Sequence, residues 1–358
     1  MKFIHCADLH LDSKIKELPT EKSKIRREEI IRTFERLCDY AKNNLVRAVI
    51  IAGDMFDTAH VTLKTRERVL GAINACENVD FIYVSGNHDD VNFISELENV
   101  PVNLKVVGEE WCYYEYDDVC VAGVMLTKVN SKTIYDTLNL NKDKINIVTM
   151  HGQVVGHKGE SDVETISIPK LKEKNIDYLA LGHVHGYGQG QIDLRGKYAY
   201  SGCLDGRGFD ELGDKGFVLI DVENNSLTTE FVKFSSRTLH EYEFDVEKYD
   251  NWTNAVLALE GMLYSTFDKE SLVKVTLVGE HKTDFYVDKE SLAFRLNEHF
   301  FFAKVNDKTK LKIQQEDYDL DKSVRGEFVR QVMQSELDEE QKKSVILLGL
   351  GALKGEEF

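Results

Sequence analysis

The stretch DYLALGHVHGYG, residues 177–188, runs through a short apolar segment into a glycine and two histidines, His183 and His185. Its apolar part predicts a buried strand. A strand that only packed into a core would end in a turn, whereas this one ends on two imidazole rings, whose nitrogens bind metal ions. The stretch therefore predicts a sheet that carries a metal site at the carboxyl end of this strand.

Four other predicted strands end in the same way, in the stretches KFIHCADLH, AVIIAGDMFD, FIYVSGNHD and INIVTMHG. In chain order they end on Asp8 and His10, on Asp54 and Asp57, on Asn87, His88 and Asp89, and on His151. Ligands of open α/β sheets collect outside the carboxyl ends of the strands. We therefore expect these side chains to meet at one edge of the sheet. Each motif alone is common by chance, but all five in this order are not.

The candidate metal ligands are two aspartates, one asparagine and four histidines: Asp8, His10, Asp54, Asn87, His151, His183 and His185. This set is too rich in oxygen for a structural zinc site, and it is larger than one ion needs. It suits two divalent ions about 3.5–4 Å apart that share a carboxylate and act on phosphorus. We expect Mn²⁺, with Fe²⁺, Zn²⁺ and Mg²⁺ as alternatives. Glycines, which allow close backbone approach in a crowded site, adjoin the ligands at positions 53, 86, 152 and 182.

Short apolar runs alternate with helical patterns up to about residue 235, which indicates a layered α/β architecture. Strands are expected at 2–6, 46–52, 81–85, 102–107, 112–116, 119–124, 145–150, 178–181, 197–201 and 216–222, and helices at 23–43, 63–76, 131–138 and 169–174. Beyond residue 234, strands at 239–244, 273–278 and 301–305 alternate with helices at 251–266 and 289–298. This β-α-β-α-β unit is large enough to be a small domain, and the chain from residue 323 onward is expected to be helical.

Composition limits the class of protein. The 358 residues, 42% hydrophobic and 30% charged, are typical of a soluble protein with more than one domain. We expect it to be cytoplasmic, because no window approaches the roughly 18 apolar residues of a membrane helix. The net charge of −17 disfavours tight non-specific DNA binding by this chain alone. The six cysteines form no CxxC pair and are expected to be small buried hydrophobes in a reducing compartment.

Several residues near the motifs have simpler interpretations. His5 is predicted to be buried rather than a ligand, and His60 and His157 to lie in exposed loops. For Arg207 and Phe209 we expect ordinary loop packing, with contacts to a phosphate and a base as the alternative. The basic start of the first long helix is expected to be a solvated face: Lys22, Lys24, Arg26 and Arg27.

The motifs DxH, GDxxD, GNHD, a lone HG and GHxH, in this order over residues 8–185, resemble the calcineurin-like metallophosphoesterase superfamily. The segment GDMFDTAHV is similar to the corresponding segment of bacterial DNA repair exonucleases of the SbcD kind. Residues 199–222 are similar to the segment that closes their catalytic domain, and VRGEFVR, residues 324–330, is similar to the YhaO-type branch.

This resemblance implies a four-layer α/β/β/α sandwich of two mixed sheets, with a small α+β capping domain and C-terminal helices. The implied domains are a nuclease domain at 1–236, a capping domain at 237–312 and a helical segment at 313–358. The C-terminal helices would dock onto an SMC-like coiled-coil ATPase of the SbcC kind, or alternatively pack back onto their own domain. A homodimer is usual for the family.

The resemblance also assigns roles to single residues. It implies that Asp8, His10 and His185 hold the first metal ion, that Asn87, His151 and His183 hold the second, and that Asp54 bridges them. His88 would act at the scissile phosphate. Asp57 would orient a ligand histidine or a water, or alternatively cap the next helix.

The implied activity is that of a dinuclear-metal phosphodiesterase, a DNA exonuclease or endonuclease in DNA repair. The alternatives are a small-molecule phosphodiesterase or phosphatase on the same scaffold, and a catalytically weak scaffold protein.

Overall fold

The structure is a computed structural model. It describes residues 1–57, 61–86, 89, 100–154, 165–282, 285–312, 318 and 321–354, so the predicted site residues Asn87 and His88 lie outside it, as do His60 and His157. The chain separates into two compact units, Met1–Leu239 and His240–Phe358.

The first unit contains two six-stranded sheets, and the first of them holds the strands that precede Asp8, Asp54 and Asn87. Its order is β14 (Ser226–Lys233), β13 (Gly216–Glu223), β1 (Lys2–Cys6), β2 (Val46–Ala52), β3 (Asp80–Val84) and β4 (Leu104–Val107). The strands from β1 to β4 are parallel, and β13 is antiparallel to both of its neighbours.

The second sheet holds the strands that precede the remaining candidate ligands. Its order is β11 (Gly188–Gln191), β12 (Lys197–Tyr200), β10 (Tyr178–Gly182), β7 (Ile145–His151), β6 (Val119–Gly123) and β5 (Cys112–Tyr116). The four inner strands are parallel, and the two edge strands β11 and β5 are antiparallel to their neighbours. Both sheets are therefore mixed, as expected.

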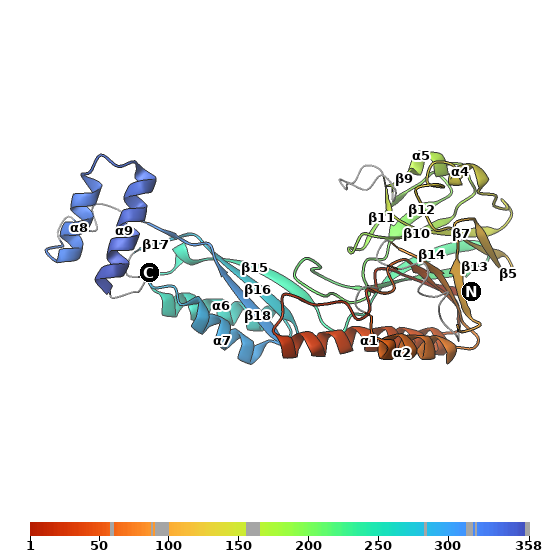
Figure 1. Cartoon of the computed structure of the whole chain (residues 1–358), viewed down its shortest axis with the longest axis horizontal. Helices are drawn as coiled ribbons and strands as arrows, with labels where there is room; N and C mark the ends of the chain where they lie inside the picture. The colour runs from red at the N-terminus through yellow and green to blue at the C-terminus, as the bar shows by residue number, and fades with distance from the viewer. Residues whose placement is uncertain are drawn as a thin grey trace. The chain divides into compact units, whose positions relative to one another are not determined.

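The two sheets pack face to face and helices cover their outer faces (Figure 1). The interior is apolar and draws on both sheets, with Phe3, Ile50 and Ile82 from the first and Ile147 and Ala180 from the second. Figure 1 shows α1 (Thr20–Asn43) and α2 (Leu63–Asn74) on one side of this unit, and α4 (Ile134–Thr137) and α5 (Ile168–Leu171) on the other. The predicted four-layer α/β/β/α sandwich is confirmed.

Two strands of the large sheets, β14 and β11, have no counterpart among the predicted strands, and neither does the short pair β8 (Gln153–Val154) and β9 (Thr165–Ile166). The strand β14, SLTTEFVK, lies at a sheet edge and alternates exposed and half-buried residues, so it lacks an apolar run. The strand β11, GQGQ, contains no apolar residue. Both are held by backbone hydrogen bonds to a neighbouring strand, which is a tertiary effect that hydrophobic patterning cannot report.

The basic start of α1 differs from its prediction, because Arg26 is completely buried. Its Nη2 donates to Oδ1 of Asp205 at 2.7 Å and to the carbonyl oxygen of Gly206 at 2.6 Å. Its Nη1 donates to Glu29 at 2.8 Å and to Ser236 at 2.7 Å. The predicted solvated face is therefore wrong at this position, because the partners other than Glu29 come from segments about 180 to 210 positions further along the chain.

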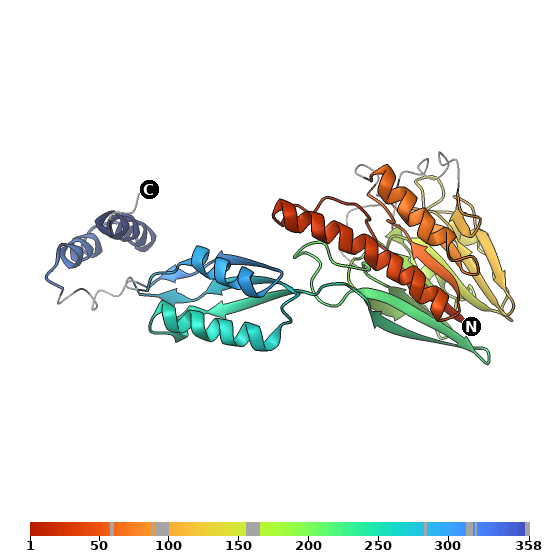
Figure 2. The same ribbon diagram turned by 90° about the horizontal axis from the view of Figure 1, so that it is seen from below.

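The second unit has the predicted β-α-β-α-β order. These elements are β15 (Leu239–Asp245), α6 (Trp252–Thr266), β16 (Leu272–Val278), α7 (Lys289–His299) and β18 (Phe302–Asp307), and the unit also contains the short paired strands β17 (Glu280–His281) and β19 (Lys310–Leu311). The three strands form one sheet in the order β15-β16-β18, and both helices lie on the same side of it (Figure 2). An apolar core that includes Phe244, Leu259, Val275 and Leu296 joins the sheet to the helices.

The end of the chain is helical, as predicted, with α8 (Val324–Met333) and α9 (Glu339–Lys354). The two helices pack on each other through a small cluster that contains Val329, Ile346 and Leu350. Among the described residues, no helix combines the length and the hydropathy needed to cross a membrane.

Candidate metal centre

The described candidate ligands lie at the carboxyl ends of β1, β2, β7 and β10: His151 is the last residue of β7, and the others lie in the loops that follow the other three strands. The strands β1 and β2 are parallel neighbours in one sheet, and β7 and β10 are parallel neighbours in the other. The expectation of a single sheet edge is therefore wrong. The ligands come from two facing sheets, because β2 contacts both β7 and β10 across the sandwich.

Asp54 stands between two histidines from different sheets. Its Oδ2 lies 3.6 Å from Nε2 of His10 and 3.6 Å from Nε2 of His151. All three side chains are at most 3% exposed. A carboxylate in this position can bridge two cations, one on each side.

His10 and His185 face each other, with 3.3 Å between their Nε2 atoms. Metal–nitrogen bonds are about 2.0–2.1 Å long, so two imidazoles on one cation place their nitrogens about 3.0–3.4 Å apart. The observed distance fits shared coordination of one ion.

The ligand atoms form two groups that share Asp8. One group is Asp8, His10 and His185, the other is Asp8, Asp54 and His151, and within each group the ligand atoms lie within 4.8 Å of one another. Since the donors are imidazoles and carboxylates, the residues present fit a pair of divalent transition-metal ions.

His183 adjoins the second group. Its backbone N–H donates to Oδ1 of Asp8 at 2.9 Å, and its ring meets that of His151 edge to face, with 5.5 Å between the centroids. The structure therefore places His183 beside His151 and His185 beside His10.

Backbone contacts set the orientation of His151. Its Nδ1 lies 2.9 Å from the carbonyl oxygen of Ala52. A carbonyl can only accept, so Nδ1 carries the proton and Nε2 presents its lone pair to the site. Gly53 allows this approach, because a Cβ there would lie 2.0 Å from Nδ1 of His151 and its φ is +99°.

A buried carboxylate with no assigned role in the sequence motifs orients His185. Oε1 of Glu211 lies 2.8 Å from Nδ1 of His185 and also accepts hydrogen bonds from Arg207. Burial would raise the pKa of Glu211, but the hydrogen bonds from His185 and Arg207 outweigh it and hold this pKa well below its usual range. The ionised carboxylate directs the other nitrogen of the imidazole toward His10. Nζ of Lys215 adds a hydrogen bond to the carbonyl oxygen of His185 at 2.8 Å.

Burial raises the pKa of Asp8 to about 7, although the nearby charge of His185 lowers it, while that of Asp54 raises it further. Two carboxylates this close and this deeply buried repel each other. Bound cations would relieve that repulsion and keep both carboxylates ionised.

The backbone around the site is strained. Asp8, His10, Asp54 and His183 all have φ between +43° and +98°, a region that side chains with a Cβ rarely adopt. Such residues cost on the order of 1–3 kcal/mol each and cluster at functional sites. Here hydrogen bonds between the two loops hold them, from the N–H of Asp8 to the carbonyl of Gly53 and from that of His10 to the carbonyl of Asp54.

Two further buried aspartates support these loops. Asp12 accepts from the N–H of Thr62 at 2.8 Å, and this ties the loop after β1 to the start of α2. Asp89 accepts from the N–H groups of Phe56 at 3.0 Å and Gly86 at 2.9 Å, which joins the loops after β2 and β3. The sequence contained a signal for these supporting roles, since Asp12 and Asp89 each follow a predicted metal ligand by two positions.

The structure brings six of the seven predicted ligands together: Asp8, His10, Asp54, His151, His183 and His185. Asn87 and the predicted catalytic His88 lie outside the described residues. Asp57 is half-buried, and it does not cap α2, because the cap is Thr62. His5 is buried as predicted and contacts the hydroxyl of Tyr178 at 2.8 Å. Phe209, at 5% exposed, packs in its loop.

The fold and the clustered ligands define a class of protein. The family model of calcineurin-like phosphoesterases matches residues 1–187, and the chain belongs to this family. It is therefore a phosphoester hydrolase of a family that binds two divalent metal ions.

The chain is also similar to particular proteins. It is 26% identical to the uncharacterized metallophosphoesterase YhaO of Bacillus subtilis, over 75% of this chain and 68% of the relative. It is 24% identical to the SbcD component of the nuclease SbcCD of Staphylococcus epidermidis, over 64% of this chain and 68% of the relative. It is 21% identical to the DNA double-strand break repair protein Mre11 of Sulfolobus acidocaldarius, over 72% and 70%.

Among solved structures, a dimetal phosphatase from Danio rerio is similar at 10% identity with a TM-score of 0.44. The match covers 64% of this chain and 95% of that one.

Proposed function

We propose that the protein is a metal-dependent DNA nuclease that hydrolyses phosphodiester bonds with two divalent ions, Mn²⁺ being the expected metal. The observation that carries this proposal is the position of Asp54, whose Oδ2 lies 3.6 Å from a histidine nitrogen on either side. A carboxylate that lies between ligands of two ions can bridge them, and two bridged ions are the arrangement used for in-line attack on phosphorus.

We assign each site residue a role in this proposed reaction. The first ion would be held by Asp8, His10 and His185, the second by Asn87, His151 and His183, and both by Asp54. When bound, the ions would supply Lewis-acid activation of a water and would neutralise charge on the phosphate. His88 would protonate the leaving 3′ oxygen. Asp57 would orient a water or a ligand near the site. The roles of Asn87, His88 and Asp57 rest on the sequence resemblance.

DNA as the substrate is supported by the relatives and by the second unit. Two of the relatives are, by name, a component of a nuclease and a DNA double-strand break repair protein. The residues that follow Leu239 form a separate compact unit with its own apolar core, which a small-molecule phosphatase does not need. We propose that this unit caps the DNA and that the nuclease acts in DNA repair in the cytoplasm.

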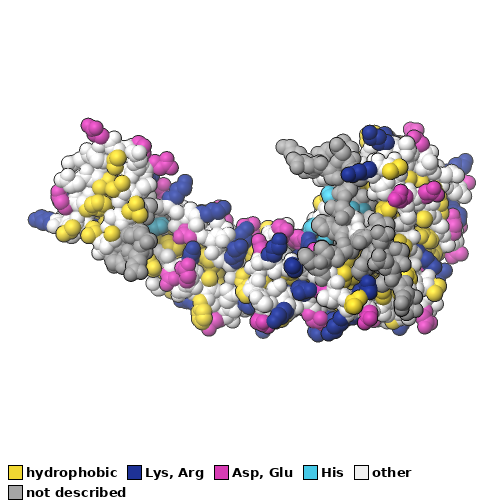
Figure 3. Space-filling model, viewed as in Figure 1, with side chains coloured by type: hydrophobic (Ala, Val, Ile, Leu, Met, Phe, Trp, Pro, Cys, Tyr) yellow, Lys and Arg dark blue, Asp and Glu magenta, His cyan; other side chains and the backbone are white. Residues whose placement is uncertain are grey.

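An ATPase partner of the SMC-like, SbcC kind would supply the affinity for DNA that this chain lacks. The net charge is −17, and Figure 3 shows acidic and basic side chains interspersed on the visible face. The C-terminal helices are the proposed docking site. Part of α9 packs on α8, but Leu348 is 56% exposed and Leu353 51% exposed. The double substitution Leu348→Glu and Leu353→Glu should abolish co-purification with such a partner and leave metal binding unchanged.

The test of the activity is cleavage of end-labelled single-stranded and hairpin DNA by the purified chain with Mn²⁺. We expect cleavage that chelator abolishes and that Asp54→Asn reduces by at least about a hundredfold. Turnover of an aryl phosphodiester without cleavage of either DNA, alone or with the ATPase, would assign the site to a small-molecule phosphodiesterase. Preference for an aryl monoester would indicate a phosphatase, and metal binding without any turnover would indicate a scaffold.

A further inference from the structure

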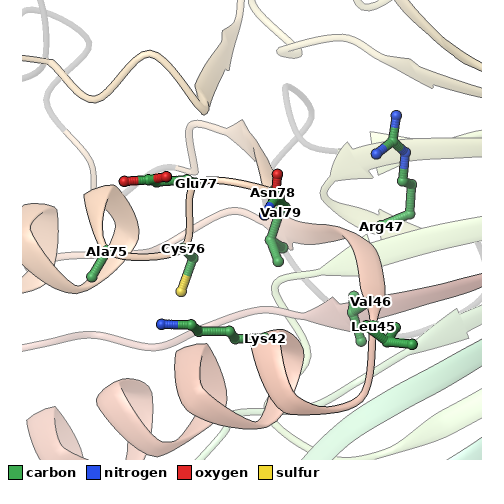
Figure 4. Close-up of a pocket in the computed structure, with 9 residues that line it drawn as sticks. All are labelled: Lys42, Leu45, Val46, Arg47, Ala75, Cys76, Glu77, Asn78 and Val79. Atoms are coloured by element: carbon green, nitrogen blue, oxygen red, sulfur yellow. The ribbon is translucent and has the colours of Figure 1, made fainter.

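A pocket lined by charged residues and a cysteine lies where β2 and β3 begin, at the opposite end of these strands from the candidate metal centre. The pocket, of about 460 Å³, opens between the end of α1 and the segment that joins α2 to β3. Lys42, Arg47, Cys76 and Glu77 line it, together with small apolar residues (Figure 4). None of these residues belongs to the proposed nuclease mechanism.

Two cysteines meet at this pocket. Sγ of Cys76 lies 3.5 Å from the carbonyl oxygen of Cys38, a residue 38 positions earlier in α1. The two thiols are also close enough for each to shift the pKa of the other. Cys38 is 2% exposed and Cys76 is 3% exposed, but Cys76 borders the pocket.

The charges around the two thiols make them unequal. The interaction with the Cys38 thiol lowers the pKa of Cys76, burial opposes this, and the ammonium of Lys42 lowers it further against the opposing charge of Asp39. Figure 4 shows the sulfur of Cys76 directed toward that ammonium. The interaction with the Cys76 thiol, together with burial, raises the pKa of Cys38 well above its usual range. A thiol that loses its proton more readily, next to one that keeps it, is the arrangement of an attacking and a resolving cysteine.

The other cysteines lack this combination. Burial raises the pKa of Cys6, and it raises that of Cys120 to about 12. Burial also raises the pKa of Cys203 well above its usual range. Cys112 is the most exposed of the six, and its Sγ contacts a backbone carbonyl at 3.7 Å. Exposure alone would therefore select Cys112, whereas the paired geometry selects Cys76.

We propose that Cys38 and Cys76 are a redox modification site, which hydroperoxides convert to an intramolecular disulfide. The Cys76 thiolate attacks one oxygen of the peroxide, the O–O bond breaks, and an alcohol or water leaves. The resulting sulfenic acid is attacked by the Cys38 thiol, the S–S bond forms, and a second water leaves. Two thiols are oxidised by two electrons and the peroxide is reduced by two. The disulfide joins the last turns of α1 to the start of the segment that leads into β3.

The decisive experiment treats the full-length protein with a small excess of hydrogen peroxide, alkylates the remaining thiols, and maps the peptides by mass spectrometry. We expect a linked pair of peptides containing Cys38 and Cys76, reversed by a dithiol reductant. Cys76 should lose its free thiol about tenfold faster than Cys112. Oxidation of Cys112 first, or conversion of Cys76 to a sulfinic acid while Cys38 stays alkylatable, would overturn the proposal.

Variants separate the two roles. In Cys38→Ser, Cys76 should stop at the sulfenic acid, which a cyclic 1,3-diketone traps, whereas in Cys76→Ser the reactivity of Cys38 should be lost. The control Cys112→Ser should form the linked peptides at the wild-type rate. A Cys38→Ser protein that yields no trapped adduct on Cys76 contradicts the mechanism. Should either variant fail to fold, the peptide map of the wild-type protein decides alone.

Discussion

Nε2 of His10 faces Nε2 of His185 at a distance of 3.3 Å, and the two residues lie 175 positions apart in the chain. Each ring is held by its own loop, so no local sequence effect brings them together. Two imidazoles in this arrangement are stabilised by a shared cation. The first prediction follows from this pair.

Mn²⁺ should stabilise the folded protein in a saturable way. A ligand that binds only the native state raises stability by about 2.7 kcal/mol at a hundred times its dissociation constant. Calorimetric titration should give two ions per chain, and one ion in His10→Ala, because Asp54 and His151 remain. A stoichiometry of two in His10→Ala would contradict the division of ligands described above.

Glu211→Gln should weaken metal binding without unfolding the protein. Glu211 acts through His185, so its loss removes the ionised acceptor that orients the ring, and such partners typically contribute 10–100-fold to affinity. The measurement is Mn²⁺ affinity by calorimetry, with Glu211→Asp as the conservative variant. The matched control Glu230→Gln, on the exposed side of β14, should bind metal normally. Equal affinity in both Gln variants would show that the contact has no positioning role.

Gly86→Ala should damage the site by direct contact. A Cβ at Gly86 would lie 2.1 Å from Oδ1 of Asp54, closer than atoms can approach. We expect loss of at least one metal ion and of most of the proposed phosphodiesterase activity. Gly108→Ala serves as the control, because nothing lies within 4 Å of a Cβ there. If both variants keep full metal occupancy, the packing around Asp54 is looser than described.

Protonation of Glu29 should make the first unit less stable in acid. Burial would raise its pKa, but hydrogen bonds from Arg237 and Arg26 outweigh this and lower it below the ordinary 4.5. A carboxyl group whose pKa is lowered on folding stabilises the protein at pH values above its unfolded-state pKa. This contribution disappears as the pH falls through the folded-state pKa. The thermal midpoint of Glu29→Gln should therefore lie below that of the wild type at pH 7, and the gap should narrow below about pH 4. A gap that stays constant down to pH 3 would exclude this linkage.

The sequence alone was sufficient for the strands that carry the ligands, because β1, β2, β7 and β10 are almost entirely buried and are predominantly apolar in sequence. It also indicated which side chains follow them, since a motif at a strand end is a local property. Strands β11 and β14 were missed, because their pairing with a neighbour, and not their composition, makes them strands.

Tertiary structure decided the rest. That the ligands come from two facing sheets depends on the packing of the sandwich, which no single strand encodes. Arg26 was expected on a solvated face and Glu211 belongs to none of the motifs, yet both are buried, because their partners Asp205 and His185 lie in segments that only folding brings near. Periodicity reports how a residue relates to its neighbours in the chain, whereas a buried charge is defined by a partner at a distance that the fold alone sets.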